Sequence, residues 1–586
     1  MRHTRAAILS MSILFVTGCG SPDRNFSKLA EEFVDTTLAF SPVTATATGL
    51  HRYQGRNLDE QLDDMSPDAV GHRREYYRHF RERLQNVQPN TLSPEERADL
   101  HIIQNQVELA LLDIDDIQSH LHNPTVYVEM IGNALFTPLT LAYAPLPVRI
   151  HDIIARLNKL PLLLDQASTN LVSSPDIWTT VAQEENEGNI ALVDKTIRAA
   201  VPADQRAEYD RAAGPALDAL RRFQQFLHDN LSVLNGYNWR LGRERYTRKF
   251  RDVLDTGEDP STMLEAATRR LQEVRARMLE LALPLHRQYF PSHSPHTDLP
   301  VSERQNRVIS EVLDHIAQRH STPASYLDDA RADLEEARRF VAEKHLLTLP
   351  AGSNLQVIPT PVFMRGLYGV GGFNPAPALE PQLGAFYWVT PIPPDWTPQQ
   401  AESKLREYNF YKLKLLTLHE AIPGHYVQFQ YANQIQPPAR RLLRALYGND
   451  PYVEGWAQYA TQMMLDEGFL DNSPELRLTF LKEELRVLAN AILDVRLQML
   501  NMTDQEALDL MEKQTFQEAA EATAKLQRAK LSSAQLPCYF VGWRGWLAVR
   551  AQYQHARGAS FQLAQFNDAA LREGAVPLTA LYSLLH

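Results

Sequence analysis

The sequence is organised around one short stretch, Leu418-His419-Glu420-Ala421-Ile422-Pro423-Gly424-His425. In the His-Glu-x-x-His motif of zinc peptidases, two histidines at i and i+4 share one helix face and bind Zn²⁺, while the glutamate acts as general base. Here the second histidine stands at i+6. On a continuous helix the two side chains would point about 120° apart, because that spacing turns through roughly 600°. Pro423 and Gly424 favour a break in the helix, which would bring His425 back towards His419.

A second motif lies downstream of the first. It reads Glu454-Gly455-Trp456-Ala457-Gln458-Tyr459, and together the two motifs resemble the bacterial family known as domain of unknown function 885. That family is grouped with the zinc metallopeptidases whose third ligand is a glutamate on a downstream helix. The similarity runs from Pro42 to Gly542, and the two motifs are its most specific part.

The resemblance implies a metal centre with one Zn²⁺ per chain. His419, His425 and Glu454 would be the ligands, and Glu420 would be the general base. Three protein ligands leave one position of a tetrahedral zinc open, as in catalytic sites. Without the resemblance, Glu454 would be interpreted as a solvated charge, and a lone histidine near an apolar face as a hydrogen-bonded core residue.

Two residues near the C-terminus are candidates for contact with a substrate. Tyr539 lies in Gln535-Leu536-Pro537-Cys538-Tyr539-Phe540-Val541-Gly542, which matches a motif of the family. A phenol near zinc can donate a hydrogen bond to a developing oxyanion, but an aromatic side chain packed in the core is an equal alternative. Arg528 can bind a substrate carboxylate through two hydrogen bonds, although we favour a surface salt bridge.

Helical periodicity dominates the rest of the chain. Apolar residues spaced three and four apart form one face over about 262–283, where Thr262 and Glu265 predict a capping box. Similar amphipathic stretches cover approximately 26–39, 93–113, 148–170, 205–233, 325–345, 476–500 and 504–530, and Thr503 with Glu506 predicts a capped start for the last. We therefore predict a mostly α-helical protein, and the resemblance implies a metallopeptidase-like fold with a deep groove.

Two stretches before the first motif break the helical pattern. Residues 355–358 and 384–390 are predicted strands, which would form a small sheet or hairpin next to the active-site helix. An edge strand there could pair with an extended peptide, so we expect Tyr387 to contact substrate. A hairpin that only covers the core is an equal alternative. A capped helix is then predicted to run from Thr397 to His419.

A linker is predicted from Phe290 to Val301, where Pro, Ser and His are frequent. It would divide the chain into a signal segment at 1–19, an N-terminal helical part at 20–290 and a motif-bearing part at 291–586. His293 and His296 lie within this linker. We interpret both as exposed loop residues that need no metal.

The N-terminus is typical of a bacterial lipoprotein signal. Arg2 and Arg5 precede an apolar run that ends in Val16-Thr17-Gly18-Cys19, which resembles a lipobox and would make Cys19 the lipidated first residue. The run is too short to span a bilayer as a helix. We therefore expect an outer-membrane lipoprotein that faces the periplasm and is attached only by its lipid. The alternative is a cleaved signal with an incidental cysteine.

Composition narrows the classes of function. The chain of 586 residues has a formal net charge of -12 and no basic block, which argues against nucleic acid and against attachment to anionic lipid by charge. The other thiol, Cys538, is interpreted as buried and inert, because no activating base is near it in sequence. The sequence does not indicate the oligomeric state.

These features predict a zinc-dependent hydrolase, and specifically a peptidase that acts on peptide substrates. Glu420 would take a proton from the attacking water, and Tyr539 would stabilise the oxyanion. The sequence does not indicate whether a peptide is cut internally or from one end. Two alternatives stay open. One is hydrolysis of a non-peptide amide, and the other is a periplasmic binding or scaffold lipoprotein with a degenerate metal site.

Overall fold

The computed structural model describes residues 22–352, 354–360, 370–394 and 396–585. These residues are mostly helical, as predicted, with two small sheets. Cys19 and the rest of the predicted signal lie outside the described residues. Within the described ranges, no helix is both long enough and apolar enough to cross a bilayer.

The described residues before 256 form twelve α-helices and one short hairpin, with 3₁₀ and π segments between some of them. The hairpin consists of β1 (Arg52–Tyr53) and β2 (Arg56–Asn57). The helices are α1 (Pro22–Phe40), α2 (Pro42–Thr48), α3 (Pro67–Gln85), α4 (Pro94–Leu112), α5 (Ser119–His122), α6 (Thr125–Thr140), α7 (Leu146–Leu157), α8 (Leu160–Asn170), α9 (Asp176–Ala191), α10 (Arg198–Ala200), α11 (Arg206–Asp229) and α12 (Gly242–Leu254).

The remainder of the described chain carries the longer helices and a three-stranded sheet. The strands are β3 (Leu355–Pro359), β4 (Gly371–Asn374) and β5 (Ala385–Val389). The helices are α13 (Pro260–Tyr289), α14 (Val301–Ile316), α15 (Tyr326–Lys344), α16 (Pro398–Glu407), α17 (Phe410–Glu420), α18 (His425–Ala432), α19 (Pro438–Leu446), α20 (Asp450–Asp466), α21 (Pro474–Met499), α22 (Asp504–Asp509), α23 (Ala519–Leu531), α24 (Cys538–Arg557), α25 (Leu563–Arg572) and α26 (Leu578–Leu584).

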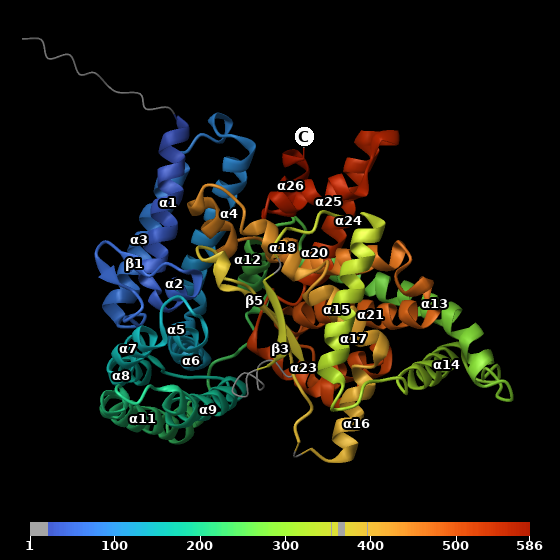
Figure 1. The fold of residues 1–586 in the computed structure, drawn as a ribbon, viewed down its shortest axis with the longest axis horizontal. Coiled ribbons are helices and arrows are strands. Elements are labelled where there is room, and N and C mark those ends of the chain that lie inside the picture. Colours follow the sequence, from blue (N-terminus) through green and yellow to red (C-terminus); the bar gives the residue numbers. More distant parts are fainter. Residues whose placement is uncertain (1–21, 353, 361–369, 395, 586) are drawn as a thin grey trace, which may run out of the picture.

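The three-stranded sheet lies between helices from the two halves of the chain (Figure 1). Its order is β3-β5-β4, with β3 parallel and β4 antiparallel to β5. The two predicted strands are therefore present but do not form a hairpin, and β4 was not predicted. Successive side chains of a strand face opposite sides of a sheet. Phe386 and Trp388 accordingly pack on the core of α6–α11, whereas Tyr387 packs on the core of the C-terminal helices.

The caps explain where several helices begin. Thr503 and Glu506 form the predicted capping box at the start of α22. The cap predicted at Thr262 is wrong, because α13 begins earlier. The carboxylate of Asp259 accepts hydrogen bonds from the amides of Ser261 and Thr262 and so caps the helix just before its first-turn proline.

The helix predicted from Thr397 to His419 is two helices. Thr397 caps α16 as expected, but α16 ends at Glu407. Asn409 then caps α17, since its side chain accepts hydrogen bonds from the amides at the start of that helix. The first motif thus follows a short helix, α17, with its own cap.

The segment from Phe290 to Val301 joins two neighbouring helices of one core. Both α13 before it and α14 after it pack against α21. His293 is exposed, as interpreted from the sequence. The interpretation is wrong for His296, whose side chain is only 15% exposed, because it turns inwards to Glu311.

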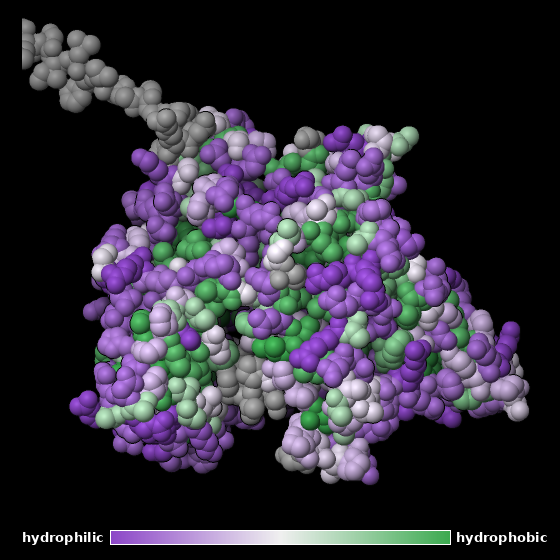
Figure 2. Space-filling model, in the orientation of Figure 1, coloured by the Kyte–Doolittle hydropathy of each residue, from purple (hydrophilic) through white to green (hydrophobic). Residues whose placement is uncertain are grey.

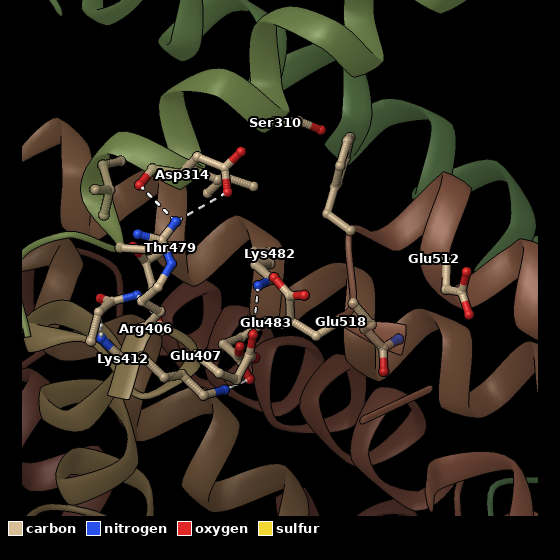
Figure 3. Close-up of a pocket in the computed structure, with 16 residues that line it drawn as sticks. Ser310, Asp314, Arg406, Glu407, Lys412, Thr479, Lys482, Glu483, Glu512 and Glu518 are labelled. Atoms are coloured by element: carbon tan, nitrogen blue, oxygen red, sulfur yellow. Dashed lines mark hydrogen bonds and ion pairs between the residues drawn. The ribbon is translucent and has the colours of Figure 1, made fainter. Parts of the chain in front are cut away.

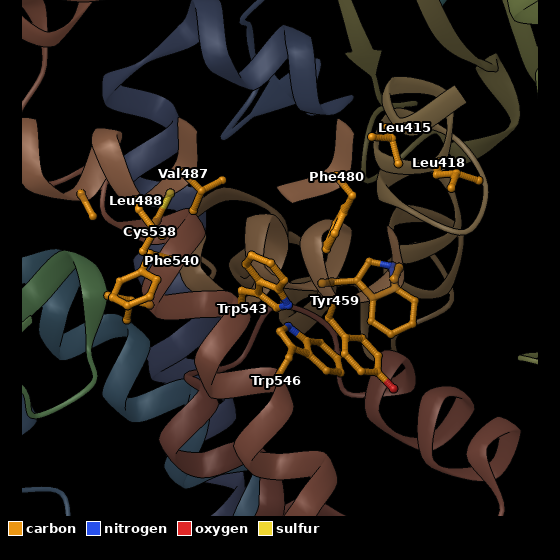
Figure 4. Packing of buried hydrophobic residues seen from close by; sticks show 14 of the residues in the cluster. Leu415, Leu418, Tyr459, Phe480, Val487, Leu488, Cys538, Phe540, Trp543 and Trp546 are labelled. Atoms are coloured by element: carbon orange, nitrogen blue, oxygen red, sulfur yellow. The ribbon is translucent and has the colours of Figure 1, made fainter. Parts of the chain in front are cut away.

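Helices α20 and α24 cross closely at the centre of the C-terminal core. A Cβ atom added to Gly455 would lie 2.3 Å from the carbonyl carbon of Gly542, so this contact requires glycine. Next to the crossing, the ring of Trp546 stacks on Tyr459 at 5.7 Å and meets Trp456 at 5.0 Å. Figure 4 shows Tyr459 and Trp546 side by side in this core. On the outer face drawn in Figure 2, hydrophilic residues surround smaller hydrophobic patches.

Candidate metal centre

The first motif contains the predicted break. Helix α17 ends at Glu420, and α18 begins at His425. The amide of Gly424 donates a hydrogen bond to the carbonyl oxygen of Leu418 at 3.0 Å, which closes the loop between the two helices. A Cβ atom at Gly424 would lie 1.8 Å from the carbonyl oxygen of His419. Glycine is therefore required here for the close approach of two backbone segments.

The break brings both histidines of the motif against one carboxylate on α20. Atom Nε2 of His419 lies 3.6 Å from Oε2 of Glu454, and Nε2 of His425 lies 3.4 Å from the same oxygen. The two imidazole rings are nearly perpendicular, with centroids 4.8 Å apart. Donor atoms about 3.3 Å apart form the edges of a tetrahedron whose centre is about 2.0–2.1 Å from each, as for zinc. The distances therefore fit a small cation.

The charges in the cluster also fit a cation. Oε2 of Glu454 is buried and accepts no hydrogen bond within the described ranges, and a buried oxygen without a donor is costly. Burial opposes ionisation of this carboxyl and of the His425 imidazole, but their mutual attraction prevails. It holds the pKa of Glu454 well below its ordinary value and raises the pKa of His425.

The cluster keeps some access to solvent. The side chains of His419, His425 and Glu454 are 17%, 10% and 20% exposed. Three ligands with partial exposure are the arrangement that leaves room for a water or a substrate at a catalytic metal.

Glu420 is held beside the cluster by the sheet. Its Oε2 accepts a hydrogen bond from the backbone amide of Phe373 at 3.0 Å. Phe373 belongs to β4, which is an edge strand of the sheet among the residues that the structure describes. This strand therefore orients the carboxylate that the motif predicts to be the base.

The other predicted site residues lie in different surroundings. Tyr539 is half-buried at the start of α24. Burial raises the pKa of its phenol well above the ordinary value, and the negative charge of Glu454 raises it further. The phenol is therefore close enough to the cluster to interact with the charge of Glu454. Arg528 is exposed on α23. Tyr387 is fully buried, and its hydroxyl lies 3.2 Å from that of Thr417. The expectation that Tyr387 contacts substrate is thus corrected. Tyr387 packs against α17 from within the core, where a substrate does not reach it.

Two nearby residues were not predicted to shape the site. Trp456 is fully buried, and its indole Nε1 donates hydrogen bonds to the carbonyl oxygens of Pro423 at 2.9 Å and Gly424 at 3.2 Å. Asp450 lies one turn before Glu454 on α20 and has contact with solvent. Desolvation, and then the charge of Glu454, raises the pKa of its carboxyl to about 6. Trp456 could have been found from the sequence, because it lies in the second motif. No sequence motif pointed to Asp450.

A polar pocket lies elsewhere, between α14, α16, α17 and α21 (Figure 3). Its charged side chains pair with one another: Lys412 with Glu483, and Lys482 with Glu407 at 3.0 Å. No residue of the His-His-Glu cluster lines this pocket. The pocket therefore belongs to the packing around α17 and not to the candidate metal centre. Cys538 is buried, as predicted.

The fold and the site together define a class of protein. It is a helical protein with a candidate metal centre, in which the break between α17 and α18 presents two histidines and α20 presents a glutamate. The chain belongs to the bacterial family of proteins of unknown function DUF885, whose model matches residues 42–585. A search of curated proteins finds no match.

Two solved structures resemble the whole chain. One is a candidate lipoprotein of unknown function from Shewanella oneidensis, 27% identical, with a TM-score of 0.79 over 96% of this chain and 99% of the other. The second is a candidate lipoprotein from Colwellia psychrerythraea, 17% identical, with a TM-score of 0.77 over 96% of this chain and 98% of the other. The second likeness concerns the fold alone.

Proposed function

We propose that this protein is a zinc-dependent hydrolase that acts on peptides. The observation that carries the proposal is the convergence of two histidine Nε2 atoms on one buried oxygen of Glu454 that has no donor among the described residues. Zinc held by His419, His425 and Glu454 would polarise a carbonyl group and lower the pKa of a water molecule.

The residues around the ligands have separate roles in this proposal. Glu420, aligned by the Phe373 amide, takes the proton from the attacking water and passes it to the leaving amine. Tyr539 donates a hydrogen bond to the oxygen on which negative charge develops. The substrate would lie beside β4, at the mouth of the deep groove that we expect in this fold, with its carbonyl group facing the metal.

We also propose a location for the activity. The name of the Shewanella oneidensis structure includes the word lipoprotein, in agreement with the lipobox at Cys19. A lipid on Cys19 would hold the enzyme on the periplasmic side of the outer membrane, where peptides are its substrates. Radiolabelled palmitate should be incorporated by the wild type and not by Cys19→Ala.

Incubation with a peptide library, followed by mass spectrometry of the products, tests the proposed activity. We expect cleavage that a chelator abolishes and that one equivalent of Zn²⁺ restores. The positions of the cuts would separate endopeptidase from carboxypeptidase and aminopeptidase action. A zinc-loaded protein that cleaves no peptide but hydrolyses other amides would replace the peptidase by an amidase. A protein that binds no zinc would favour a binding or scaffold role.

A further inference from the structure

A second group of metal-ligating side chains lies where α13, the following loop and α14 meet. It consists of His286 in the last turn of α13, His293 and His296 in the loop, and Glu311 on α14. One ligand atom from each residue lies within 4.8 Å of all the others, which is also true of the His419 cluster. No residue is common to the two groups.

Two of the histidines converge on one carboxylate oxygen. Nε2 of His286 lies 2.8 Å from Oε2 of Glu311, and Nε2 of His296 lies 3.0 Å from the same atom. The other oxygen of Glu311 accepts a hydrogen bond from Nε of Arg307 at 2.8 Å. The arginine therefore fixes the carboxylate, and Oε2 is left to face the imidazoles.

The third histidine completes the group from the solvent side. The ring of His293 lies 4.8 Å from that of His296 and 5.5 Å from that of His286, centroid to centroid. The His293 ring also meets the ring of Phe290, with centroids 6.2 Å apart. Backbone geometry supports the arrangement, since His296 has a φ of +54°, which is uncommon for a residue other than glycine.

The group extends into the core at His286. This side chain is fully buried, and its Nε2 faces the Glu311 carboxylate. The Glu311 carboxylate thus faces three imidazoles, and imidazole nitrogen and carboxylate oxygen are both ligand types that zinc binds.

We propose that His286, His293, His296 and Glu311 form a second Zn²⁺ site. Four protein ligands close the coordination sphere, so the ion would be structural and not catalytic. It would tie the loop at 290–300 to the ends of α13 and α14, which both support α21. The proposal does not depend on the proposed peptidase activity, because the residues of the two sites are different.

Metal content by elemental mass spectrometry tests the second site directly. After equilibration with Zn²⁺ and removal of the excess, we expect two zinc ions per wild-type chain. His293→Ala and Glu311→Gln should each retain one, and so should Glu454→Ala, which removes a ligand of the other site. His79→Ala, which removes an exposed histidine that belongs to neither site, should retain two.

The pattern of losses separates the two sites. The wild type could bind one zinc ion instead of two. If Glu454→Ala then loses that ion while His293→Ala and Glu311→Gln keep it, the second site is overturned and the first stays in place. If Glu454→Ala keeps the ion while His293→Ala and Glu311→Gln lose it, the second site is supported and the result counts against the first. A wild type that binds no zinc, or His293→Ala and Glu311→Gln chains that both keep two, would also overturn the proposal.

A second measurement guards against variants that fold poorly. In Glu454→Ala, where only the second site remains, a chelator should lower the thermal unfolding midpoint, since an ion bound to the native state stabilises it. In the double variant with His293→Ala the chelator should have no effect, and zinc affinity should fall more than tenfold. His293 is exposed, so its removal leaves the core unchanged. An equal effect of the chelator in both chains would contradict the site.

Discussion

The indole nitrogen of Trp456 donates a hydrogen bond to the carbonyl oxygen of Pro423 at 2.9 Å and a second to that of Gly424 at 3.2 Å. Trp456 follows Glu454 by two positions on α20, and Pro423 precedes His425 by two positions in the break. The two motifs are therefore joined by a buried hydrogen bond as well as by the approach of His419 and His425 to Glu454. This bond fixes the helix break relative to Glu454, independently of any metal.

Trp456→Phe should weaken zinc binding about 10- to 100-fold, the range found when groups that orient metal ligands are lost. The variant keeps an aromatic ring in the core but removes the donor of the hydrogen bond to Pro423. A competition titration with a chromophoric chelator measures the affinity. Trp543→Phe is the matched control, because it removes an indole bond to Gln462 at 2.7 Å in the same core. Equal affinities in both variants would show that the bond does not position the ligands.

Gly455→Ala should destabilise the protein by about 1–3 kcal/mol and reduce zinc binding, because the new methyl group would push α20 away from Gly542 on α24. Glu454, the neighbouring residue, would move with the helix. Urea unfolding measures the change in the free energy of unfolding. Gly188→Ala on α9 has open space around the new Cβ and should stabilise the protein by about 0.5–1 kcal/mol. If both variants changed the free energy of unfolding in the same direction, the result would argue against a steric effect at the crossing of α20 and α24.

Glu420→Gln should lower peptide turnover by at least about 100-fold, as expected when a general base is lost. The amide still accepts a hydrogen bond from Phe373 and occupies the same volume, so zinc content and thermal stability should stay at the wild-type values. Glu420→Asp keeps a base on a shorter side chain and should be intermediate. Full turnover by a zinc-loaded Glu420→Gln chain would exclude Glu420 as the base.

Glu185 should make the stability of the protein depend on pH near neutrality. Burial, and then the charges of Glu129 and Glu184, raises its pKa to about 7. Because the folded-state pKa exceeds the unfolded-state value, the stabilisation is complete below pH about 4.5 and is lost as the pH rises through about 7. The unfolding midpoint of the wild type should therefore fall, relative to that of Glu185→Gln, between pH 5 and pH 8.

Glu187→Gln is the control for this pH effect, since it changes an exposed glutamate on the same helix. Its unfolding midpoint should follow that of the wild type at every pH. If Glu185→Gln also follows the wild type, Glu185 is ionised at no cost in the folded protein.

The local features of the fold were predictable from the sequence. The helical stretch at 326–344 and the strand at 385–389 agree closely with the predicted ranges, because side-chain periodicity depends on neighbours along the chain. The helix caps predicted at Thr397 and Thr503 are confirmed, and each is a capping box formed by residues three positions apart. Asn409 was missed as a cap because the apolar pattern continues on both sides of it.

The helical class of the protein and the candidate ligands His419, His425 and Glu454 could be predicted from local patterns and short motifs along the chain. Their convergence depends on tertiary contacts, because the two histidines reach Oε2 of Glu454 only when α17 and α18 pack against α20, where Trp456 donates a hydrogen bond to the carbonyl oxygen of Pro423. The tertiary structure also placed Tyr387 behind the site. The group around Glu311 became visible only in three dimensions, since α13 and α14 must pack together before His286 and His296 can reach the same carboxylate.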